Sequence, residues 1–312
     1  MNTHNPFFRA GLILGLLLAV PVALWAQSPA AETLQQQVNV RTVEQAPAQA
    51  LTSDADLGDI DVVQRIPKPD MFTFSTSQQY FYTDNVFYTH HDEQGASAYL
   101  GSYTGSIVPY STRDWTPRIN LQYNMVRYGA VPSGDFDNEN ATISSQYVFG
   151  GDRSWTWTAS VNASRFTAPH GNDHSFYQEI VYDSQVSHAQ QLLKDTPLFF
   201  IAAYDLAYHQ ANPDFFDRLD NTLSFSLAYY IVPELSVGPY VRPSSRTYWT
   251  DSSFQHDRYD FNLSAGLDVT WTPIKYMSVS ADLSHTDDYS NNSGESYDQT
   301  SPGVSLTGTY KF

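Results

Sequence analysis

The segment 259–271 reads YDFNLSAGLDVTW and alternates apolar and polar residues without a break. Its odd-numbered positions are aromatic or aliphatic, and its even-numbered positions are small or polar. Successive side chains of an extended strand point to opposite faces, so the alternation predicts a strand with one apolar and one polar face. A tilted strand of this length is also long enough to cross a bilayer.

The same alternation recurs along the chain from Met71 onward, in segments rich in Tyr, Phe, Thr, Ser and Val. Residues of these types favour a pleated, half-buried strand. The pattern predicts about twelve strands, at 71–83, 98–110, 117–128, 139–150, 154–166, 177–191, 197–209, 218–231, 235–248, 258–271, 276–286 and 299–312.

The connections between these segments fall into two length classes. Those after the even-numbered strands are short (STRDWT, GGDR, LKDT, VPE and TPIK), and those after the odd-numbered strands are longer and polar. Short turns at one end and long loops at the other are typical of outer-membrane barrels. We therefore predict an all-β fold, a transmembrane antiparallel up-and-down β-barrel of about 12 strands with both ends in the periplasm. A soluble β-sandwich is the alternative, but its turns need not sort by length.

Composition agrees with a membrane barrel. The chain is 15% aromatic and only 16% charged, contains no Cys, and carries a formal net charge of −17. The absence of Cys excludes disulfides and thiolate metal sites, and the acidic balance argues against nucleic acid as a partner. Aromatic residues at strand ends suit the two membrane interfaces. We expect one girdle beside the short turns and one beside the long loops: Trp115, Trp155, Trp157, Trp271 and Tyr276 in the first, Tyr82, Tyr128, Tyr208, Trp249 and Tyr259 in the second.

Three regions are predicted along the chain. Residues 1–26 combine a basic start at Arg9 with a short apolar run, as in a signal peptide, with cleavage after Ala26 or Ala30. Residues 27–69 are rich in Ala, Gln and Asp and poor in aromatics, so we expect a disordered periplasmic leader there. The alternative is that this leader acts as a plug or as a partner-binding tether. Residues 70–312 form the barrel, and the expected location is the bacterial outer membrane.

Three sequence features suggest a family. The chain contains YTDNVF at 82–87 after its first strand, TPIKY at 272–276 in a short turn, and a last strand that ends at Phe312. With these features the region 71–312 resembles the β-barrel porins of bacterial outer membranes, in particular the porin-2-like family. The resemblance implies an outer-membrane porin-like protein, and it supplies no catalytic or ligand residues.

Assigning the apolar set of each strand to lipid leaves a polar set for the lumen. The predicted pore-lining residues are Asp205, Asp220, Tyr240, Arg242, Arg246, Asp260, Asp268 and Asp282, with His209 beside them. Asp and Arg mixed across a lumen would create a transverse field and a constriction. The excess of acid favours cations or neutral polar solutes. Alternatively, these side chains pair with one another and fill the interior.

The function that this predicts is passive diffusion of a small solute cargo through a channel. The alternative is a surface-exposed structural or adhesive barrel with a closed lumen and acidic loops. A hydrolase is a third hypothesis, for which HTDDY at 285–289 and the outward His188 are the candidates. Histidines with acidic neighbours also gather in the long loops, as in HGNDH at 170–174, but no recognised ligand motif occurs. We expect no catalytic residue, no metal and no cofactor.

The remaining partners follow from the membrane setting. Arg127 and Arg165 face outward near the long loops, where they could bind lipopolysaccharide phosphates or simply snorkel to the interface. Tyr310 and Phe312 lie on the lipid face of the last strand and resemble the signal read by the barrel assembly machinery. We expect that strand to pair with 71–83 and close the barrel.

Overall fold

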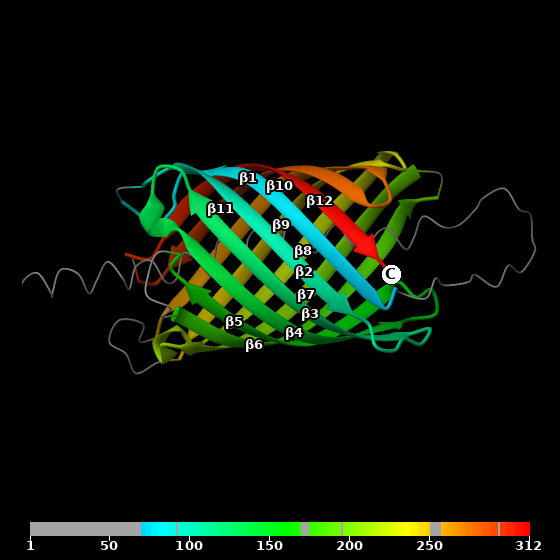
Figure 1. Cartoon of the computed structure of the whole chain (residues 1–312), viewed down its shortest axis with the longest axis horizontal. Helices are drawn as coiled ribbons and strands as arrows, with labels where there is room; N and C mark the ends of the chain where they lie inside the picture. Colours follow the sequence, from blue (N-terminus) through cyan, green and yellow to red (C-terminus); the bar gives the residue numbers. More distant parts are fainter. Residues whose placement is uncertain (1–69, 92, 170–174, 195, 250–256, 293) are drawn as a thin grey trace, which may run out of the picture.

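The computed structural model describes residues 70–91, 93–169, 175–194, 196–249, 257–292 and 294–312, and its twelve strands close into one barrel (Figure 1). Each strand pairs antiparallel with its neighbours in sequence, and β1 pairs with β12. The predicted signal peptide and leader lie outside the described residues. The strands are β1 (Phe72–Thr83), β2 (Ala96–Ile107), β3 (Trp115–Tyr128), β4 (Phe136–Phe149), β5 (Trp155–Thr167), β6 (Ser175–Leu193), β7 (Thr196–Asn212), β8 (Arg218–Val232), β9 (Leu235–Tyr248), β10 (Tyr259–Ile274), β11 (Met277–Ser290) and β12 (Tyr297–Lys311).

The predicted fold class is confirmed, and several of the predicted long loops are shorter than expected, including those after β7 and β11. β7 continues to Asn212 because it pairs with the long strand β6 up to Gln178. β11 continues to Ser290 because Asp287 and Asp288 pair with the start of β12. Backbone pairing with a neighbour therefore decides where these strands end, even where the side chains are typical of loops.

The seam between β1 and β12 closes the barrel as predicted. Their register runs from Thr73 opposite Lys311 to Phe81 opposite Gly303. Beyond it, the backbones of Phe72 and Phe312 exchange two hydrogen bonds of 3.0 Å, and their rings stack at 5.6 Å. The last strand is thus paired on both of its edges.

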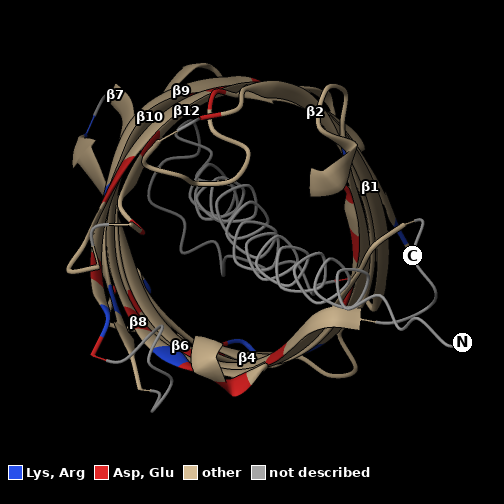
Figure 2. Cartoon of the chain, turned by 90° about the vertical axis from the view of Figure 1, so that its left-hand side faces the viewer, with Lys and Arg blue, Asp and Glu red and all other residues tan. Residues whose placement is uncertain are grey.

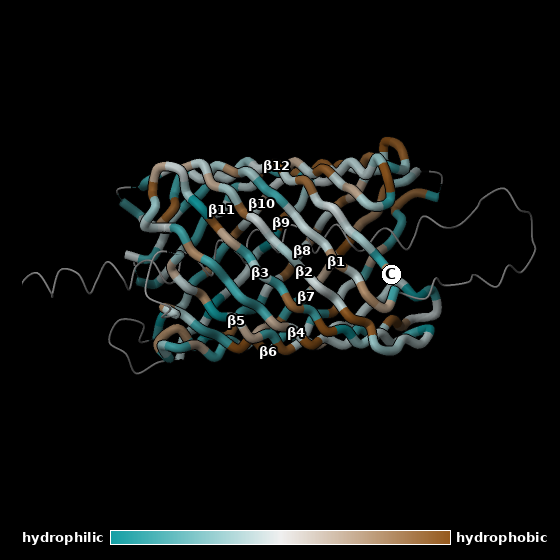
Figure 3. Tube along the Cα trace, viewed as in Figure 1, coloured by the Kyte–Doolittle hydropathy of each residue, from teal (hydrophilic) through white to brown (hydrophobic). Residues whose placement is uncertain are grey.

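The two faces of the wall have opposite chemistry. Apolar outward side chains remain exposed, as at Leu121 (63%) and Ile143 (67%), whereas inward positions carry Ser, Thr, Asn, Gln and charged residues. Figure 3 shows the resulting alternation of hydrophobic and hydrophilic residues along the trace. An apolar outer surface around a polar interior is the arrangement that a membrane barrel requires. No helix within the described ranges is long and apolar enough to span a membrane.

Nine of the ten predicted girdle residues lie on the outer wall, and Tyr128 does not. Trp115, Trp155, Trp157, Trp271 and Tyr276 are exposed near the short turns, and Tyr82, Tyr208, Trp249 and Tyr259 face outward near the long loops. Tyr128 is 5% exposed and faces inward, because it shares the inner face of β3 with Asn124 and Val126, beside Ala98 of β2.

Tyr128 belongs to an apolar cluster inside the long-loop end of the barrel, which we call the mouth cluster. Phe136, Phe166, Tyr177 and Phe216 form a chain of ring contacts with centroid separations of 5.9, 5.3 and 5.7 Å. Figure 2 views the barrel from this end. This inward apolar patch was not predicted from the sequence. The cluster consists of Phe81, Val86, Ala96, Ala98, Leu100, Val126, Tyr128, Phe136, Phe166, Tyr177, Ala211 and Phe216.

The YTDNVF motif holds the β1–β2 connection against the mouth cluster. Asn85 is fully buried, and its side-chain amide donates to the carbonyls of Thr89 (2.8 Å) and Asp298 (3.1 Å) while accepting from the Thr89 amide (3.0 Å). Gln299 donates to the Thr83 hydroxyl at 2.6 Å and to the Asn85 carbonyl at 3.0 Å. The motif thereby ties the connection to β12 and places Val86 in the cluster.

Candidate functional site

The inner wall divides into two arcs of different polarity. The amide arc, on β1–β5, carries mainly Ser, Thr, Asn and Gln, and the charged arc, on β6–β11, carries most of the ionisable side chains. All eight predicted pore-lining residues face inward on the charged arc: Asp205 on β7, Asp220 on β8, Tyr240, Arg242 and Arg246 on β9, Asp260 and Asp268 on β10, and Asp282 on β11. Their part in conduction stays a prediction.

The amide arc is a connected hydrogen-bond network. Asn124 donates to Asn138 at 3.1 Å, and Asn140 donates to Asn162 at 3.1 Å. Within the described strands β1–β5, the single charged side chain that faces inward is Arg118, near the short-turn end of β3. This wall therefore offers hydroxyl and amide groups to a solute and little charge.

Arg246 does not face Asp220 or Asp260 across the lumen, as a transverse pair of charges would. Arg246 stands in register with Asp220 on one side and with Asp260 on the other, so these charges are neighbours along one arc. They do not face one another across the lumen. The reason is topological, since β8, β9 and β10, which carry these three residues, are neighbours in the barrel.

The upper part of the charged arc, near the long loops, contains close ion pairs. His209 lies between two carboxylates, with Nδ1 3.0 Å from Glu179 Oε2 and Nε2 3.2 Å from Asp220 Oδ2. The Arg218 Nε also donates to both oxygens of Asp220, at 3.1 and 3.2 Å. Tyr177 of the mouth cluster donates its hydroxyl to Glu179 at 3.0 Å, which joins the ion pairs to the apolar patch.

A second ion-pair group lies at the same end, across Arg246. The Arg258 Nε donates to both oxygens of Asp260 at 2.9 Å, and Nη1 lies 2.9 Å from Glu295 Oε2. Its guanidinium also sits 4.7 Å from the ring centroid of Tyr248. Because these groups are buried and paired, this end of the arc is a structural network rather than a set of free charges.

The middle of the charged arc is more acidic. Asp268 and Asp282 stand directly opposite each other on β10 and β11, and Asp183 and Asp205 lie on β6 and β7. Arg242 of β9 is the basic side chain at this depth, with its Nε 3.3 Å from the Ser224 hydroxyl. Like charges placed opposite each other across strands cost free energy. In this acidic middle band, carboxylates outnumber guanidinium groups.

Tyr240 reaches into the middle band over Gly266. A Cβ on Gly266 would lie 2.5 Å from the Tyr240 ring carbon that bears the hydroxyl, and 2.6 Å from the backbone oxygen of Leu283. Only glycine leaves room for the ring to cross β10 here. Arg242 lies 5.3 Å from the ring centroid, so tyrosine and arginine cover the same part of the wall.

Several members of these groups were missed from the sequence alone. Glu179 and Asp183 follow the inward parity of β6 and could have been found from it. Arg218 and Arg258 begin two of the predicted strands and share the inward parity of Asp220 and Asp260, so they too could have been found from it. Their roles follow only from the neighbouring strands.

The rim residues that the structure describes do not form the sites considered for them. Among the described residues no group of three or more His, Cys, Asp or Glu could hold a metal ion, and HGNDH lies outside the described residues. Residues 285–289 belong to β11 rather than to a loop, with His285 and Asp287 on the outer wall and Asp288 on the inner wall. The HTDDY motif is thus split between two faces. His188 faces outward as predicted and packs against Trp155 at 4.5 Å.

Comparison with known proteins supports the fold. An outer-membrane channel from Pseudomonas putida F1 aligns with a TM-score of 0.55 at 13% identity, covering 82% of this chain and 100% of that one. The NanC porin aligns with a TM-score of 0.43 at 9% identity, covering 75% and 98%, and LpxR from Salmonella typhimurium with 0.43 at 8%, covering 76% and 100%. No family model and no curated protein matches. The predicted resemblance to outer-membrane barrel porins is confirmed at the level of the fold.

Proposed function

We propose that the protein is an outer-membrane channel for the passive diffusion of small polar solutes, and that it passes cations in preference to anions. The acidic middle band carries this proposal. Four inward carboxylates lie there with one guanidinium, that of Arg242. A wall of one sign in a narrow lumen raises the local concentration of the opposite ion and excludes ions of its own sign. On the wall opposite the acidic middle band, the hydroxyl and amide side chains of the amide arc would form hydrogen bonds with the polar groups of the solute.

Refolded protein in a planar bilayer tests the proposal. Under a salt gradient, the reversal potential should show cation preference, and the double substitution D268N/D282N should reduce it. Asp298 is an exposed aspartate on the outer wall of β12, so D298N is the matched control and should leave the potential unchanged. A wild-type channel that prefers anions, or one whose preference is the same in both variants, would contradict the proposed selectivity.

One observation favours a second candidate, a surface barrel with a closed lumen. The mouth cluster and the tethered β1–β2 connection reduce the opening at the long-loop end. A protein that refolds fully and yet gives no ion-conducting events in the bilayer would support this second function. Frequent, stable openings would exclude it.

A further inference from the structure

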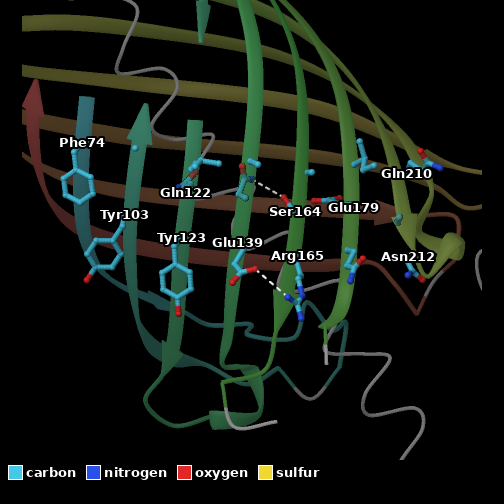
Figure 4. Close-up of a pocket in the computed structure, with 18 residues that line it drawn as sticks. Phe74, Tyr103, Gln122, Tyr123, Glu139, Ser164, Arg165, Glu179, Gln210 and Asn212 are labelled. Atoms are coloured by element: carbon cyan, nitrogen blue, oxygen red, sulfur yellow. Dashed lines mark hydrogen bonds and ion pairs between the residues drawn. The ribbon is translucent and has the colours of Figure 1, made fainter. Parts of the chain in front are cut away.

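The outer wall carries a groove that the channel proposal does not use. It has a volume of about 910 Å³ and extends across β1–β7 (Figure 4). Two parallel rows of outward side chains border it, and its floor is the backbone of the inward residues between them, such as Asn140 and Ser164. The groove therefore opens toward the lipid and not toward the lumen.

The two rows follow the hydrogen-bonding direction from strand to strand. Consecutive members of each row are register partners. Neighbouring strands lie about 4.8 Å apart, so a groove across seven strands is about 29 Å long. One row is Asn212, Gln178, Arg165, Glu139, Tyr123 and Tyr103, and the other is Gln210, Ile180, Ala163, Ala141, Leu121, Gly105 and Phe74.

Small residues make the groove deep enough to hold a chain. Ala163 and Ala141 lie in the middle of the second row, and Gly105 lies beyond Leu121 near its end, where a Cβ would meet nothing within 4 Å. The next outward positions, Ile143 and Val161, are bulky and exposed at 67% and 44%. A slot of small side chains between larger ones fits a linear hydrocarbon and leaves little space for a branched or globular ligand.

The groove is polar at one end and apolar at the other. Near the long loops it is bordered by Gln178, Asn212 and Arg165, whose side chain is 45% exposed. The nearest oxygen of Glu139 lies 3.9 Å from Arg165 Nη1, which is the outer limit of an ion pair. Toward the short turns the lining changes to tyrosine, Leu121 and Phe74. Long loops face outside in barrels of this class, so the polar end lies in the outer leaflet.

We propose that this groove binds lipopolysaccharide. One acyl chain would lie along the second row, over Ala163 and Ala141, and the phosphorylated sugar would lie at Arg165, Gln178 and Asn212. A guanidinium can give a phosphate two parallel N–H donors, and the two amides match sugar hydroxyls. Glu139 can accept a hydrogen bond from another hydroxyl of the same sugar. A phospholipid offers the chain but no sugar, and it is the competing ligand in the test.

Native mass spectrometry of the purified barrel in detergent tests the site, with bisphosphorylated lipid A, phosphatidylethanolamine and inorganic phosphate as probes. Wild-type protein should retain one lipid A molecule in preference to phosphatidylethanolamine. The substitution A141L/A163L fills the groove with apolar volume and should weaken lipid A binding roughly tenfold, because the chain loses buried area. R165Q should reduce the preference for lipid A over phosphatidylethanolamine.

The outward alanines Ala265 and Ala281 lie on β10 and β11, away from the groove, so A265L/A281L is the matched control. It should bind lipid A as the wild type does, and heat-modifiable mobility on gels should show that all variants are folded. Equal binding by A141L/A163L and the control would overturn the groove. Equal retention of lipid A and phosphatidylethanolamine by the wild type would overturn the sugar site, and displacement of lipid A by phosphate alone would overturn the acyl contribution.

Discussion

Arg246 lies between the two ion-pair groups of the upper charged arc. Its strand places it in register with Asp220 and with Asp260, and all three are buried. Without Arg246, Asp220 keeps Arg218 and His209 as partners and Asp260 keeps Arg258, so the loss is smaller than the roughly 3 kcal/mol of a buried charge with no partner. We expect R246Q to lower the urea concentration at which the barrel unfolds, as followed by heat-modifiable mobility. Arg113 is exposed in a turn, so R113Q should unfold like the wild type, and an equal effect of both substitutions would contradict this role of Arg246.

Gly266 gives a second prediction at this scale. G266A would place a methyl group against the Tyr240 ring and the Leu283 carbonyl, and only the ring can move. We expect a loss of about 1–3 kcal/mol of unfolding free energy and a change in single-channel conductance, because the ring is displaced into the lumen. A Cβ on Gly308 would have its nearest neighbour, Thr76 Cγ2, at 3.8 Å, so G308A should change neither quantity. Unchanged conductance in G266A would show that Tyr240 does not narrow the path.

At the level of single residues, the sequence predicted which face a side chain occupies but not what lies beside it. The alternation of β9 and β10 correctly predicted that Arg246 and Asp260 face inward. Whether a residue is odd or even within its strand decides its face, and this is a local property of the strand. It could not reveal that Arg246 stands between two aspartates, because register comes from the neighbouring strands. Tyr128 was misassigned for a different reason: its position at a strand end suggested a girdle, although the alternation of β3, with Arg127 outward, already places Tyr128 on the inner face.

At the level of the strands, the contacts of the β1–β12 seam allow a test that distinguishes barrel closure from recognition of the last residue by the assembly machinery. Phe72 and Phe312 stack and exchange backbone hydrogen bonds, so both rings contribute to closure. If closure is what matters, F72A and F312A should lower the yield of heat-modifiable barrel in the outer membrane to a similar extent. Phe149 is an outward aromatic near the short-turn end that also stacks on a neighbour, and F149A serves as the control.

A large loss of yield in F312A alone would instead favour recognition of the last residue by the assembly machinery. Normal yield in both variants would contradict both the closure and the recognition hypotheses. An aromatic stack contributes only about 0.5–1.5 kcal/mol, so a severe defect in one variant alone exceeds what the contact supplies.

Strand existence was predictable because strict alternation over ten or more residues matches the period of a strand and not that of a helix. Strand ends were harder to place. Loop-like residues such as Asp287, Asp288 and Asn212 continue the ladder because a longer neighbour offers hydrogen-bond partners. The inward apolar mouth cluster was missed because inward positions were identified as the polar ones, and Phe136 and Phe166 break that rule near the long loops.

At the scale of the whole molecule, the division of the lumen into a charged and an amide arc predicts how selectivity depends on salt. If the acidic middle band acts through its field, cation preference should be strong at about 0.01 M salt, where the Debye length is about 30 Å. Cation preference should be nearly lost at about 1 M salt, where the Debye length is about 3 Å. The field of the acidic middle band then does not extend across the lumen to the amide arc. Reversal potentials measured at fixed gradient ratio over this range check the prediction, with D268N/D282N showing a flatter dependence. A preference that persists unchanged at about 1 M would mean that cations contact the carboxylates directly, and selectivity would then come from binding at Asp268 and Asp282 instead of from the arc as a whole.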